Sequence, residues 1–442
     1  MTKRTQDVEL VVLGATGFTG RLVVARLALL EQRARASGGT FPRWAVAGRD
    51  AGRLRAVLDA LPAPGSTPEV IADVDVHDRG ALAHLAGRAR VLLNAVGPYS
   101  PTAEAVVEAC VAVGTHYADL SGELPLLRRV IDRFDAPART AGCQVVQLAG
   151  WEALPPDVTG LHAARLAVGA GPDDWGPGAS QPVRQLDVMV GFDEIPQVRG
   201  LNGSVSAGTM GSIVEIFADP GAAVVGDPAG LLPSRRGSGA RAVRRSSPLR
   251  VRPFVRGRRL LGPVVPVAFL NPPVLHRTAA LLATEAVAPH VPARVREGVD
   301  HGSVGDLATL RSLPGQLLAS LAQRGTAAAT RLPVDLRRSL ASAARRRLPT
   351  TGTGPAPEAL DPWRWTVRAE AVALDGRRGA ATLSGTGHPG YTATAAMLVA
   401  LGLHLAEPDR NRVVPGVVTP AVAFGPGLSP HLETPELSLT LG

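Results

Sequence analysis

The first 150 residues alternate between short apolar runs and longer segments in which apolar residues recur at helical spacing. The run at 8–13 is largely apolar, which is typical of a strand buried on both faces of a parallel sheet. The pattern predicts strands at 8–13, 44–47, 69–72, 91–95, 117–120 and 144–148, and helices at 18–36, 51–61, 78–85, 102–113 and 126–141. Strands that alternate with helices of this length indicate βαβ units, so the predicted fold class is α/β with a doubly wound parallel sheet.

Beyond residue 150 the pattern is weaker. Polar and apolar residues alternate at 185–192 and again at 363–373, and both segments are predicted strands. We expect helices at 208–217, within 278–347 and at 391–405, a flexible linker at 350–357, and an extended apolar tail at 415–424. A chain of 442 residues is about three times the length of a typical domain, so at least two domains are expected.

A glycine-rich turn joins the first predicted strand to the first predicted helix. Its sequence is Gly14-Ala15-Thr16-Gly17-Phe18-Thr19-Gly20. Glycines in this position permit a tight turn and let the backbone approach a pyrophosphate, which then lies at the positive N-terminus of the helix. The strand before it, the helix after it and the five further strands favour dinucleotide binding over a glycine-rich turn without a ligand.

The end of the second predicted strand indicates which dinucleotide is bound. Enzymes that use NAD usually carry an acidic residue there to bind the ribose 2′-hydroxyl, whereas a 2′-phosphate favours arginine. This strand is followed by Arg49, which can make a bidentate contact with the phosphate and stack on the adenine. Asp50 is better placed as the N-cap of the next helix. The sequence therefore favours NADP(H) as cofactor.

Three further strand ends carry candidate site residues, because ligands of open α/β sheets bind beyond the carboxyl ends of the strands. Asp73 follows the third strand, where it could meet the adenine amino group. Gly97, Pro98 and Tyr99 follow the fourth, where small residues permit close approach of the nicotinamide ribose. The segment 117–123 follows the fifth and carries Asp119, Ser121 and Glu123. Asp119 and Glu123 lie near the nicotinamide or only cap helices and hold loops, and the residues alone do not decide between these roles.

Composition and charge exclude several chemistries. The net charge of +9 is almost wholly due to arginine, since Lys3 is the only lysine. The chain therefore lacks a Schiff-base lysine, a P-loop lysine and the Tyr-x-x-x-Lys pair of short-chain dehydrogenases. Cys110 and Cys143 are too few for a disulfide framework or a four-ligand zinc site, and both are expected in the core. No metal site is predicted.

These motifs resemble, in their order and spacing, the saccharopine dehydrogenase-like oxidoreductases, and most of all the actinobacterial branch of trans-acting enoyl reductases. The resemblance rests on GATGFTG, AGR, NAVGPY and YADLSGE, and it continues through Ser206–Met210, Gly387–Ala395 and Gly416–Ala421. It covers most of the chain, with a gap from about 220 to 360. At Trp151-Glu152-Ala153 the chain departs from the family's usual Phe-Asp-Ser.

The resemblance implies an NADP-binding Rossmann domain over 1–150, a second mixed α/β (α+β) domain over 151–385, and a helix and tail over 386–442 that pack on the first domain. It also implies NADPH-dependent reduction of an α,β-unsaturated acyl intermediate in complex lipid or glycolipid synthesis. The substrate would be a small molecule or carrier-bound, and an acyl carrier protein or polyketide synthase would be the partner. A homodimer stays open.

The segment 235–259 holds ten arginines and no acidic residue. We expect a mobile, solvated loop there, with an anionic partner surface such as an acyl carrier domain or lipid headgroups as the alternative. Zinc-finger spacing and interleaved aromatic residues are lacking, so no nucleic-acid partner is expected. The N-terminal residues MTKRTQDVEL resemble no secretion signal, and the uncharged run from His388 to Ala406 is expected to be a buried helix. A cytoplasmic location follows, with peripheral contact at the inner face of the plasma membrane left open.

The expected mechanism is hydride delivery to the β-carbon of an enoyl thioester and protonation of the resulting enolate at the α-carbon. Tyr99 is the first candidate for the acid, with Asp119 next, and Glu123 and Glu152 as further candidates. Two other classes stay open. One is a reductase of a carbonyl or imine, as saccharopine-type enzymes are, and the other is a non-catalytic, membrane-associated scaffold that binds NADP.

Overall fold

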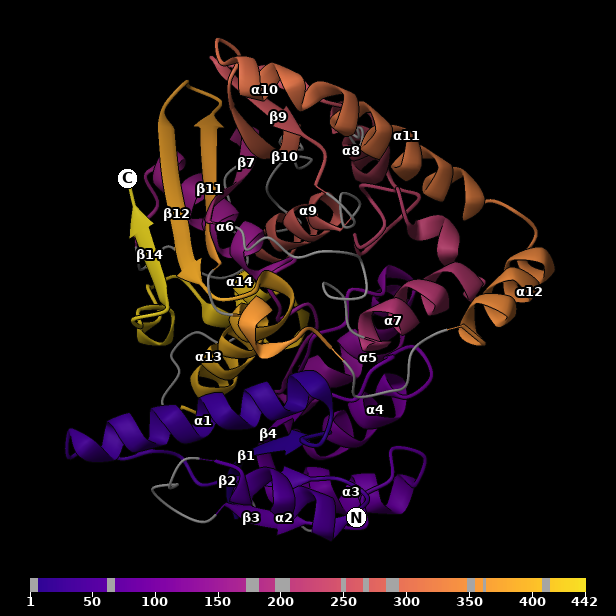
Figure 1. Cartoon of the computed structure of the whole chain (residues 1–442), viewed down its shortest axis with the longest axis vertical. Helices are drawn as coiled ribbons and strands as arrows, with labels where there is room; N and C mark the ends of the chain where they lie inside the picture. Colours follow the sequence, from indigo (N-terminus) through magenta and orange to yellow (C-terminus); the bar gives the residue numbers. More distant parts are fainter. Residues whose placement is uncertain are drawn as a thin grey trace.

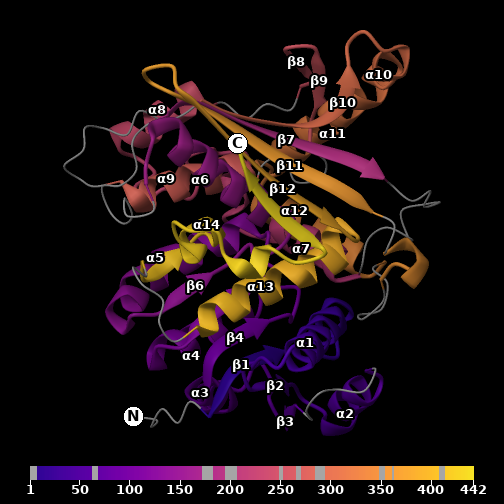
Figure 2. The ribbon, with the colours of Figure 1, turned by 90° about the vertical axis from the view of Figure 1, so that its left-hand side faces the viewer.

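The computed structural model describes residues 7–61, 68–171, 183–194, 207–247, 252–264, 270–283, 294–347, 354–360, 363–407 and 414–442. Within these ranges the chain forms two seven-stranded sheets. The sheets lie at opposite ends of the molecule, and helices pack between them (Figure 1, Figure 2).

The first sheet is parallel throughout and has the strand order β13-β6-β5-β4-β1-β2-β3. Its strands are β1 (Val8–Leu13), β2 (Trp44–Ala47), β3 (Glu69–Ile71), β4 (Ala89–Asn94), β5 (His116–Asp119), β6 (Gln144–Val146) and β13 (Gly416–Val418). The helices between them are α1 (Phe18–Ala36), α2 (Ala51–Asp59), α3 (Arg79–Arg88), α4 (Ala103–Val113) and α5 (Leu124–Ala141). This order is that of a Rossmann sheet, with the reversal between β1 and β4, and it confirms the predicted fold class.

The second sheet is mixed and has the order β14-β12-β11-β7-β10-β9-β8. Its strands are β7 (Val183–Glu194), β8 (Phe254–Arg256), β9 (Arg259–Gly262), β10 (Arg294–Ser303), β11 (Arg364–Ala373), β12 (Arg378–Thr386) and β14 (Leu437–Leu441). Strands β7 and β10 run parallel, and the other neighbours are antiparallel. The predicted strands at 185–192 and 363–373 are confirmed as β7 and β11.

The remaining helices fill the space between the sheets and cover the rim of the second one (Figure 1). They are α6 (Leu154–Val168), α7 (Ala207–Ala218), α8 (Ser238–Ser246), α9 (Asn271–Leu282), α10 (Leu307–Arg311), α11 (Leu313–Ala329), α12 (Val334–Arg345), α13 (Thr394–Ala406) and α14 (Pro420–Phe424). Helix α6 packs directly on β11 and β12. The predicted helices at 208–217 and within 278–347 therefore exist, but the strand β10 interrupts the second of these regions. The linker predicted at 350–357 lies outside the described residues except for 354–357.

The arginine-rich segment is not the loop that its composition suggested. It contains α8 and the β8–β9 hairpin, and several of its arginines are paired with carboxylates. Arg244 pairs with Asp227 at 2.7 Å, and Arg259 pairs with Asp300 at 2.6 Å. The acidic partners come from other parts of the chain, so a local count of charges could not anticipate this ordered structure.

The C-terminal segment contributes to both sheets. Strand β13 extends the first sheet beside β6, and β14 extends the second beside β12. The extended tail expected at 415–424 is wrong for its second half, because Pro420 begins the short helix α14. Proline is well suited to the first turn of a helix, where its missing N–H has no helical partner.

Helix α13 is the central element between the sheets. The 18-residue stretch Pro389–Ala406 is, among the described residues, the one helix long and apolar enough to cross a membrane, yet 83% of it is buried inside the protein. A Cβ atom added at Gly402 would lie 2.9 Å from Leu93 and 3.0 Å from Leu10, so the helix backbone rests directly on the first sheet. The predicted buried helix is confirmed, with a π-helical turn at Pro389–Ala393 before α13 begins.

A buried carboxyl group on β10 has an incomplete set of hydrogen-bond partners. Glu297 is 8% exposed, and its Oε1 accepts a hydrogen bond from the Asn271 side-chain amide. Within the described parts of the chain, neither Oε2 of Glu297 nor Oδ1 of Asn271 has a partner. Burial raises the pKa of Glu297 to about 8. A proton on Glu297 gives this pair the donor that it lacks.

The free energy of unfolding should therefore fall as pH rises from about 4.5 to about 8, because in that window the native carboxyl binds a proton that the unfolded chain has released. In Glu297→Gln the amide supplies the donor at every pH, so this contribution disappears. Relative to wild type, we expect the free energy of unfolding of the variant to increase by on the order of a few kcal/mol as pH rises from 5 to 9. Urea unfolding of both proteins across this range measures it. A difference that is independent of pH would contradict the protonated pair.

Candidate functional site

The glycine-rich turn closes against the loop that follows β4. Gly14 has φ +87°, and a Cβ there would lie 2.7 Å from Val96 Cγ2 and 3.0 Å from the Ala95 carbonyl carbon. A Cβ on Gly20 would lie 2.1 Å from the Gly14 carbonyl oxygen. Only glycine fits these two positions, so the predicted reason for the motif, close packing of the turn, is present in the structure.

The turn also leaves the N-terminus of α1 ready for an anion. The N-cap is Gly17, no side chain caps the helix, and the first turn contains no acidic residue. The first N–H groups of a helix have no partner within the helix, and its dipole favours negative charge there. The guanidinium of Arg21 holds the turn by donating to the Thr16 carbonyl oxygen at 2.9 Å. Residues 14–20 therefore fit a dinucleotide pyrophosphate.

Arg49 and Asp73 come together at the edge of the sheet beyond β2 and β3. The backbone N–H of Gly48 donates to Ile71, and that of Val74 donates back to Gly48, so the two loops are joined. Arg49 and Asp73 are both exposed, and Asp73 has φ +59°. Asp50 accepts a hydrogen bond from the Arg53 backbone N–H at 2.9 Å, which confirms it as the N-cap of α2. Among the described residues Arg49 has no carboxylate partner, so its guanidinium can contact a 2′-phosphate.

Tyr99 lies in the loop that begins with Gly97 and Pro98, after β4. Its ring is 7% exposed, and its hydroxyl donates to the Asn94 carbonyl oxygen at 3.3 Å. Burial raises the pKa of the Tyr99 hydroxyl well above its usual value, and the carboxylate of Asp119 adds to the increase. The hydroxyl is therefore turned toward the protein backbone, and its role as the acid stays a prediction.

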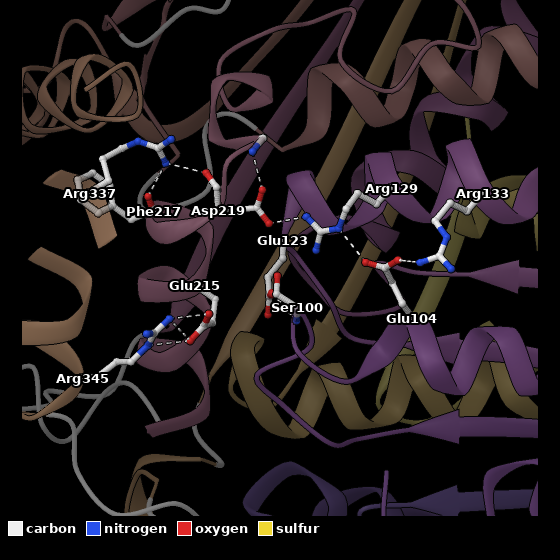
Figure 3. Close-up of polar contacts among 11 residues, drawn as sticks. Ser100, Glu104, Glu123, Arg129, Arg133, Glu215, Phe217, Asp219, Arg337 and Arg345 are labelled. Carbon is white, nitrogen blue, oxygen red and sulfur yellow. Dashed lines mark hydrogen bonds and ion pairs between the residues drawn. The ribbon is translucent and has the colours of Figure 1, made fainter. Parts of the chain in front are cut away.

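Glu123 fastens this loop to a helix of the second part of the chain. Its Oε1 accepts from the Tyr99 backbone N–H at 2.9 Å. Its Oε2 accepts from the Ser100 backbone N–H at 2.8 Å, and Figure 3 shows Glu123 beside Ser100. Ser212 on α7 donates to Oε1 at 2.7 Å. With these three donors, Glu123 holds the loop, which was one of its two predicted roles.

Asp119 belongs to a buried polar network below the same strand ends. Tyr117 donates to Asp119 Oδ2 at 2.7 Å, the Ser121 backbone N–H donates to Oδ1 at 2.9 Å, and Asn94 donates to the Tyr117 oxygen at 3.0 Å. Asp119 is fully buried, and this burial raises its pKa to about 7 although the hydrogen bonds oppose the shift. The network fixes the ends of β4 and β5, and whether Asp119 also donates a proton stays a prediction.

The carboxyl group of Glu152 differs from those of Asp119 and Glu123 in its surroundings. Its Oε2 lies 2.7 Å from the position that a Cβ on Gly150 would take, and its Oε1 lies 3.9 Å from the corresponding position on Gly122. The carboxyl group thus lies over two glycines, beyond the ends of β5 and β6. Burial raises its pKa to about 7, opposed only by its own backbone N–H. In the described structure no other side chain hydrogen-bonds to it, and the residue is half-buried.

A continuous series of rings connects this carboxyl group with the glycine-rich turn. Trp151 contacts Trp365 at 5.9 Å and Phe192 at 5.7 Å between ring centroids. The series continues through Trp363, His388 and Tyr391 to Phe18, with successive centroids between 4.8 and 6.0 Å apart. The Trp151 backbone N–H donates to Thr394 Oγ1 at 3.0 Å, which anchors this end on α13.

Glu152 was only a further candidate for the acid in the sequence, and the aromatic series was not predicted. Phe192, Trp363 and His388 come from three distant segments, and only their strand and turn positions in the second domain bring them together. The family-like segment Gly387–Ala395 was the available signal, since it supplies His388 and Tyr391. In the described part of the chain no group of three His, Cys, Asp or Glu residues could hold a metal ion, and both cysteines are buried and not joined in a disulfide.

The sheet order, the glycine-rich turn and the exposed Arg49 define a dinucleotide-dependent oxidoreductase that uses NADP(H). Residues 10–146 match the family described as the saccharopine dehydrogenase NADP binding domain. A Mycobacterium tuberculosis protein provisionally named a trans-acting enoyl reductase is 31% identical over 99% of this chain and 98% of its own. A trans-acting enoyl reductase of Mycobacterium leprae is 29% identical over 100% of this chain and 99% of its own.

The chain therefore belongs to the saccharopine dehydrogenase-like oxidoreductases, in the family of the trans-acting enoyl reductases. It is an NADPH-dependent reductase. Among solved structures, apo saccharopine dehydrogenase (L-Glu forming) from Saccharomyces cerevisiae aligns with 98% of this chain and 100% of its own, at 14% identity and a TM-score of 0.46.

Replacing Arg49 with alanine should weaken NADPH binding while leaving NADH binding almost unchanged, because only NADPH carries the 2′-phosphate. We expect the Kd for NADPH to rise at least about tenfold, which corresponds to about 1.4 kcal/mol. Calorimetric titration of both nucleotides measures the effect.

Arg43→Ala is the matched control for this prediction. Arg43 is also exposed and adjoins β2, but it precedes the strand and so lies at the opposite edge of the sheet. Its removal should leave both affinities unchanged. Equal losses of NADPH binding in the two variants would mean that general positive charge, rather than a phosphate contact, is being measured.

Proposed function

We propose that this protein reduces the C=C bond of an α,β-unsaturated acyl thioester, with NADPH as the hydride donor and Glu152 as the proton donor. Hydride adds to the β-carbon, the electron pair of the double bond moves to the carbonyl as an enolate, and Glu152 then protonates the α-carbon. The products are the saturated thioester and NADP⁺. Solvent returns the proton to the Glu152 carboxylate.

The observation that carries this proposal is the environment of Glu152. A general acid works best when its pKa lies near the working pH, because it is then protonated before the step and able to release the proton during it. Burial of the carboxyl group brings the pKa of Glu152 to about 7, although the residue as a whole is only half-buried. Asp119 has a similar pKa, but it is fully buried and held by three neighbours.

The position of Glu152 supports the same assignment. The nicotinamide end of a dinucleotide in a Rossmann sheet lies on the side of β4 and β5, across the reversal from the adenosine end. Glu152 lies over Gly122 and Gly150, the glycines that follow β5 and β6. The missing side chains of these two glycines let the carboxyl group lie directly against the loops at the strand ends.

The ring series provides an apolar surface for the acyl chain. Trp151, Phe192 and Trp363 are half-buried, so part of each ring is accessible. His388 is neutral, because burial lowers its pKa to about 4, and Gly390 donates its backbone N–H to Nδ1 at 3.1 Å. The rings of this series are uncharged, which favours an apolar substrate over an amino acid.

Bound NADPH supplies the hydride in this reaction. Residues 14–20 would hold the pyrophosphate, Arg49 would hold the 2′-phosphate, and Gly97 and Pro98 would adjoin the ribose on the nicotinamide side. Glu123 keeps their loop in place through the Tyr99 and Ser100 N–H groups. Holding the cofactor and the substrate in a fixed orientation accounts for a large share of the rate acceleration in reactions between two bound reactants.

The names of the relatives support an enoyl substrate, since the M. tuberculosis and M. leprae proteins are both called trans-acting enoyl reductases. We assign the acyl substrate to polyketide-derived complex lipids or glycolipids, with an acyl carrier domain as the partner that presents it. Reduction of a carbonyl or imine is the alternative reaction, and a non-catalytic scaffold is the alternative without one.

The test combines NADPH with 2-enoyl thioesters of short, medium and long chains. Loss of NADPH absorbance shows turnover, and the product mass and fragmentation show which bond has been reduced. A saturated thioester with its carbonyl intact supports the proposal. A reduced carbonyl with the C=C bond intact would contradict the proposal and favour the alternative reaction. NADPH binding without turnover on any thioester would favour the scaffold.

Glu152→Gln should lower kcat by about a hundredfold or more, while the Kd for NADPH stays unchanged. Glu152→Asp should restore part of the rate, because the acid is retained at a slightly different reach. In wild type kcat should fall as pH rises through about 7, since the donor must be protonated, and this decline should vanish in the Gln variant. A full rate in Glu152→Gln together with loss of activity in Tyr99→Phe would transfer the role to Tyr99.

A further inference from the structure

Helix α11 has its polar side inward and its apolar side outward. Gln316, Ser320 and Gln323 face the protein and are buried, whereas Leu317, Leu318 and Leu321 are among the most exposed leucines in the described structure. The inward side is fixed by contacts, since Gln323 donates to the Val264 carbonyl oxygen at 3.0 Å. A surface helix normally has the reverse polarity, because apolar side chains gain free energy by leaving water.

Helix α12 repeats this inversion. Arg337 is 3% exposed and donates to the carbonyl oxygens of Phe217 and Asp219 at 2.6 and 2.7 Å. The outward stripe has a spacing of four residues, close to one helical turn, and α10 adds further leucines. Together the three helices and the turn between α11 and α12 carry eight leucines that are between 38% and 69% exposed: Leu307, Leu310, Leu317, Leu318, Leu321, Leu332, Leu336 and Leu340. We call this set the leucine face.

The surface around the leucine face is strongly basic. Residues 307–347 contain eight arginines and one acidic residue, Asp335. Arg337 is buried and Arg345 pairs with Glu215 at 2.8 Å, but the other six are exposed, and none has a carboxylate partner in the described structure: Arg311, Arg324, Arg331, Arg338, Arg346 and Arg347. Six free guanidinium groups around eight leucines form a surface that is apolar and cationic at once.

The arginine-rich hairpin β8–β9 extends this surface. The Val304 backbone N–H donates to the Arg258 carbonyl oxygen at 2.8 Å, which places the turn of the hairpin next to α10. Both views show the hairpin beside α10 at the end of the molecule far from the first sheet (Figure 1, Figure 2). Arg252 and Arg258 are exposed, and Val255 on β8 is 55% exposed.

We propose that the leucine face and the β8–β9 hairpin bind the surface of an anionic lipid bilayer. The leucines enter the interface between headgroups and acyl chains, and the arginines bind headgroup phosphates. Helices that bind a membrane interface combine apolar side chains with arginine or lysine, and here exposed arginines surround the leucine face. Helix α11 has 17 residues and is about 25 Å long. A bilayer can cover a surface of this length without a complementary shape.

A second copy of this chain and an acidic carrier protein fit the observations less well. Self-association through the leucine face would bring two sets of unpaired arginines together, and like charges at close range oppose binding. A carrier protein would match the charge, but it would have to cover leucines on three helices that follow the rim of the molecule (Figure 1).

The helix α12, which carries part of the leucine face, is connected to the candidate site through α7. Arg345 pairs with Glu215 on α7, and Arg337 binds the end of the same helix (Figure 3). At its other side α7 contacts the site, where Ser212 donates to Glu123. Binding of the leucine face to a bilayer therefore holds the candidate site next to the membrane, which suits a substrate with a long acyl chain. The membrane contact itself does not rest on the proposed reaction.

Vesicle sedimentation tests this inference with the full-length protein. Vesicles of phosphatidylcholine alone are compared with vesicles that contain about one third phosphatidylglycerol, at low and at high salt. Wild type should bind the anionic vesicles, and high salt should weaken this binding. The combined variant Leu317→Ser, Leu318→Ser, Leu321→Ser should lose about tenfold or more in partitioning.

The control variant changes three exposed leucines elsewhere, Leu374→Ser, Leu428→Ser and Leu441→Ser, and should bind vesicles as wild type does. NADPH affinity, measured on every variant, shows that the fold is intact. The inference is overturned if wild type ignores anionic vesicles, or if both triple variants bind equally. A wild-type dimer that the face variant dissociates, without vesicle binding, would assign the face to a second copy.

Discussion

The two sheets share one hydrophobic core, and the site depends on this constraint. Side chains of the first sheet, such as Leu10 and Leu93, and of the second, such as Val188 and Val367, belong to a single cluster of buried residues. Helix α13 lies within it, and Gly402 lets its backbone reach the first sheet. The cofactor turn and the aromatic series are thereby connected through one core.

The same burial sets the chemistry of the carboxyl groups at the strand ends. Removal of water raises the pKa of Asp119, Glu152 and Asp157, but their partners differ. Asp157 is held by Thr278 and the Ala421 backbone N–H, and so fixes α14 in place. Asp119 is held by Tyr117 and Ser121. Glu152 lacks such partners among the described residues, and this difference separates an acid available to a substrate from two acids that hold the structure.

The sequence predicted the first sheet well because its signals are local. A buried parallel strand is apolar along its whole length, and Asp50 caps a helix through its own neighbours, so each element could be recognised without the rest of the fold. Arg49 was found for the same reason, since its position after β2 follows from the order of strands. Which site residues act on substrate remains a prediction.

Features made by distant contacts were not predictable. Strand β12 has small residues and little alternation, and it is a strand because β11 and β14 pair with it. The arginine-rich segment is ordered by Asp227 and Asp300, which lie outside it. The exposed leucines of α11 gave a helical pattern, yet only the structure shows that the polar side faces inward. The environment of Glu152 likewise depends on Gly122, thirty positions earlier in the chain.

A crystal structure with NADP⁺ bound tests the central claim, that the carboxyl edge of β4, β5 and β6 is the reductive site with Glu152 as its acid. The account predicts the 2′-phosphate on Arg49, the pyrophosphate on residues 14–20, and the reactive carbon of the nicotinamide open on the side of Glu152 and the aromatic series. A nicotinamide ring that turns away from Glu152, with its reactive face covered by protein on that side, would contradict the account.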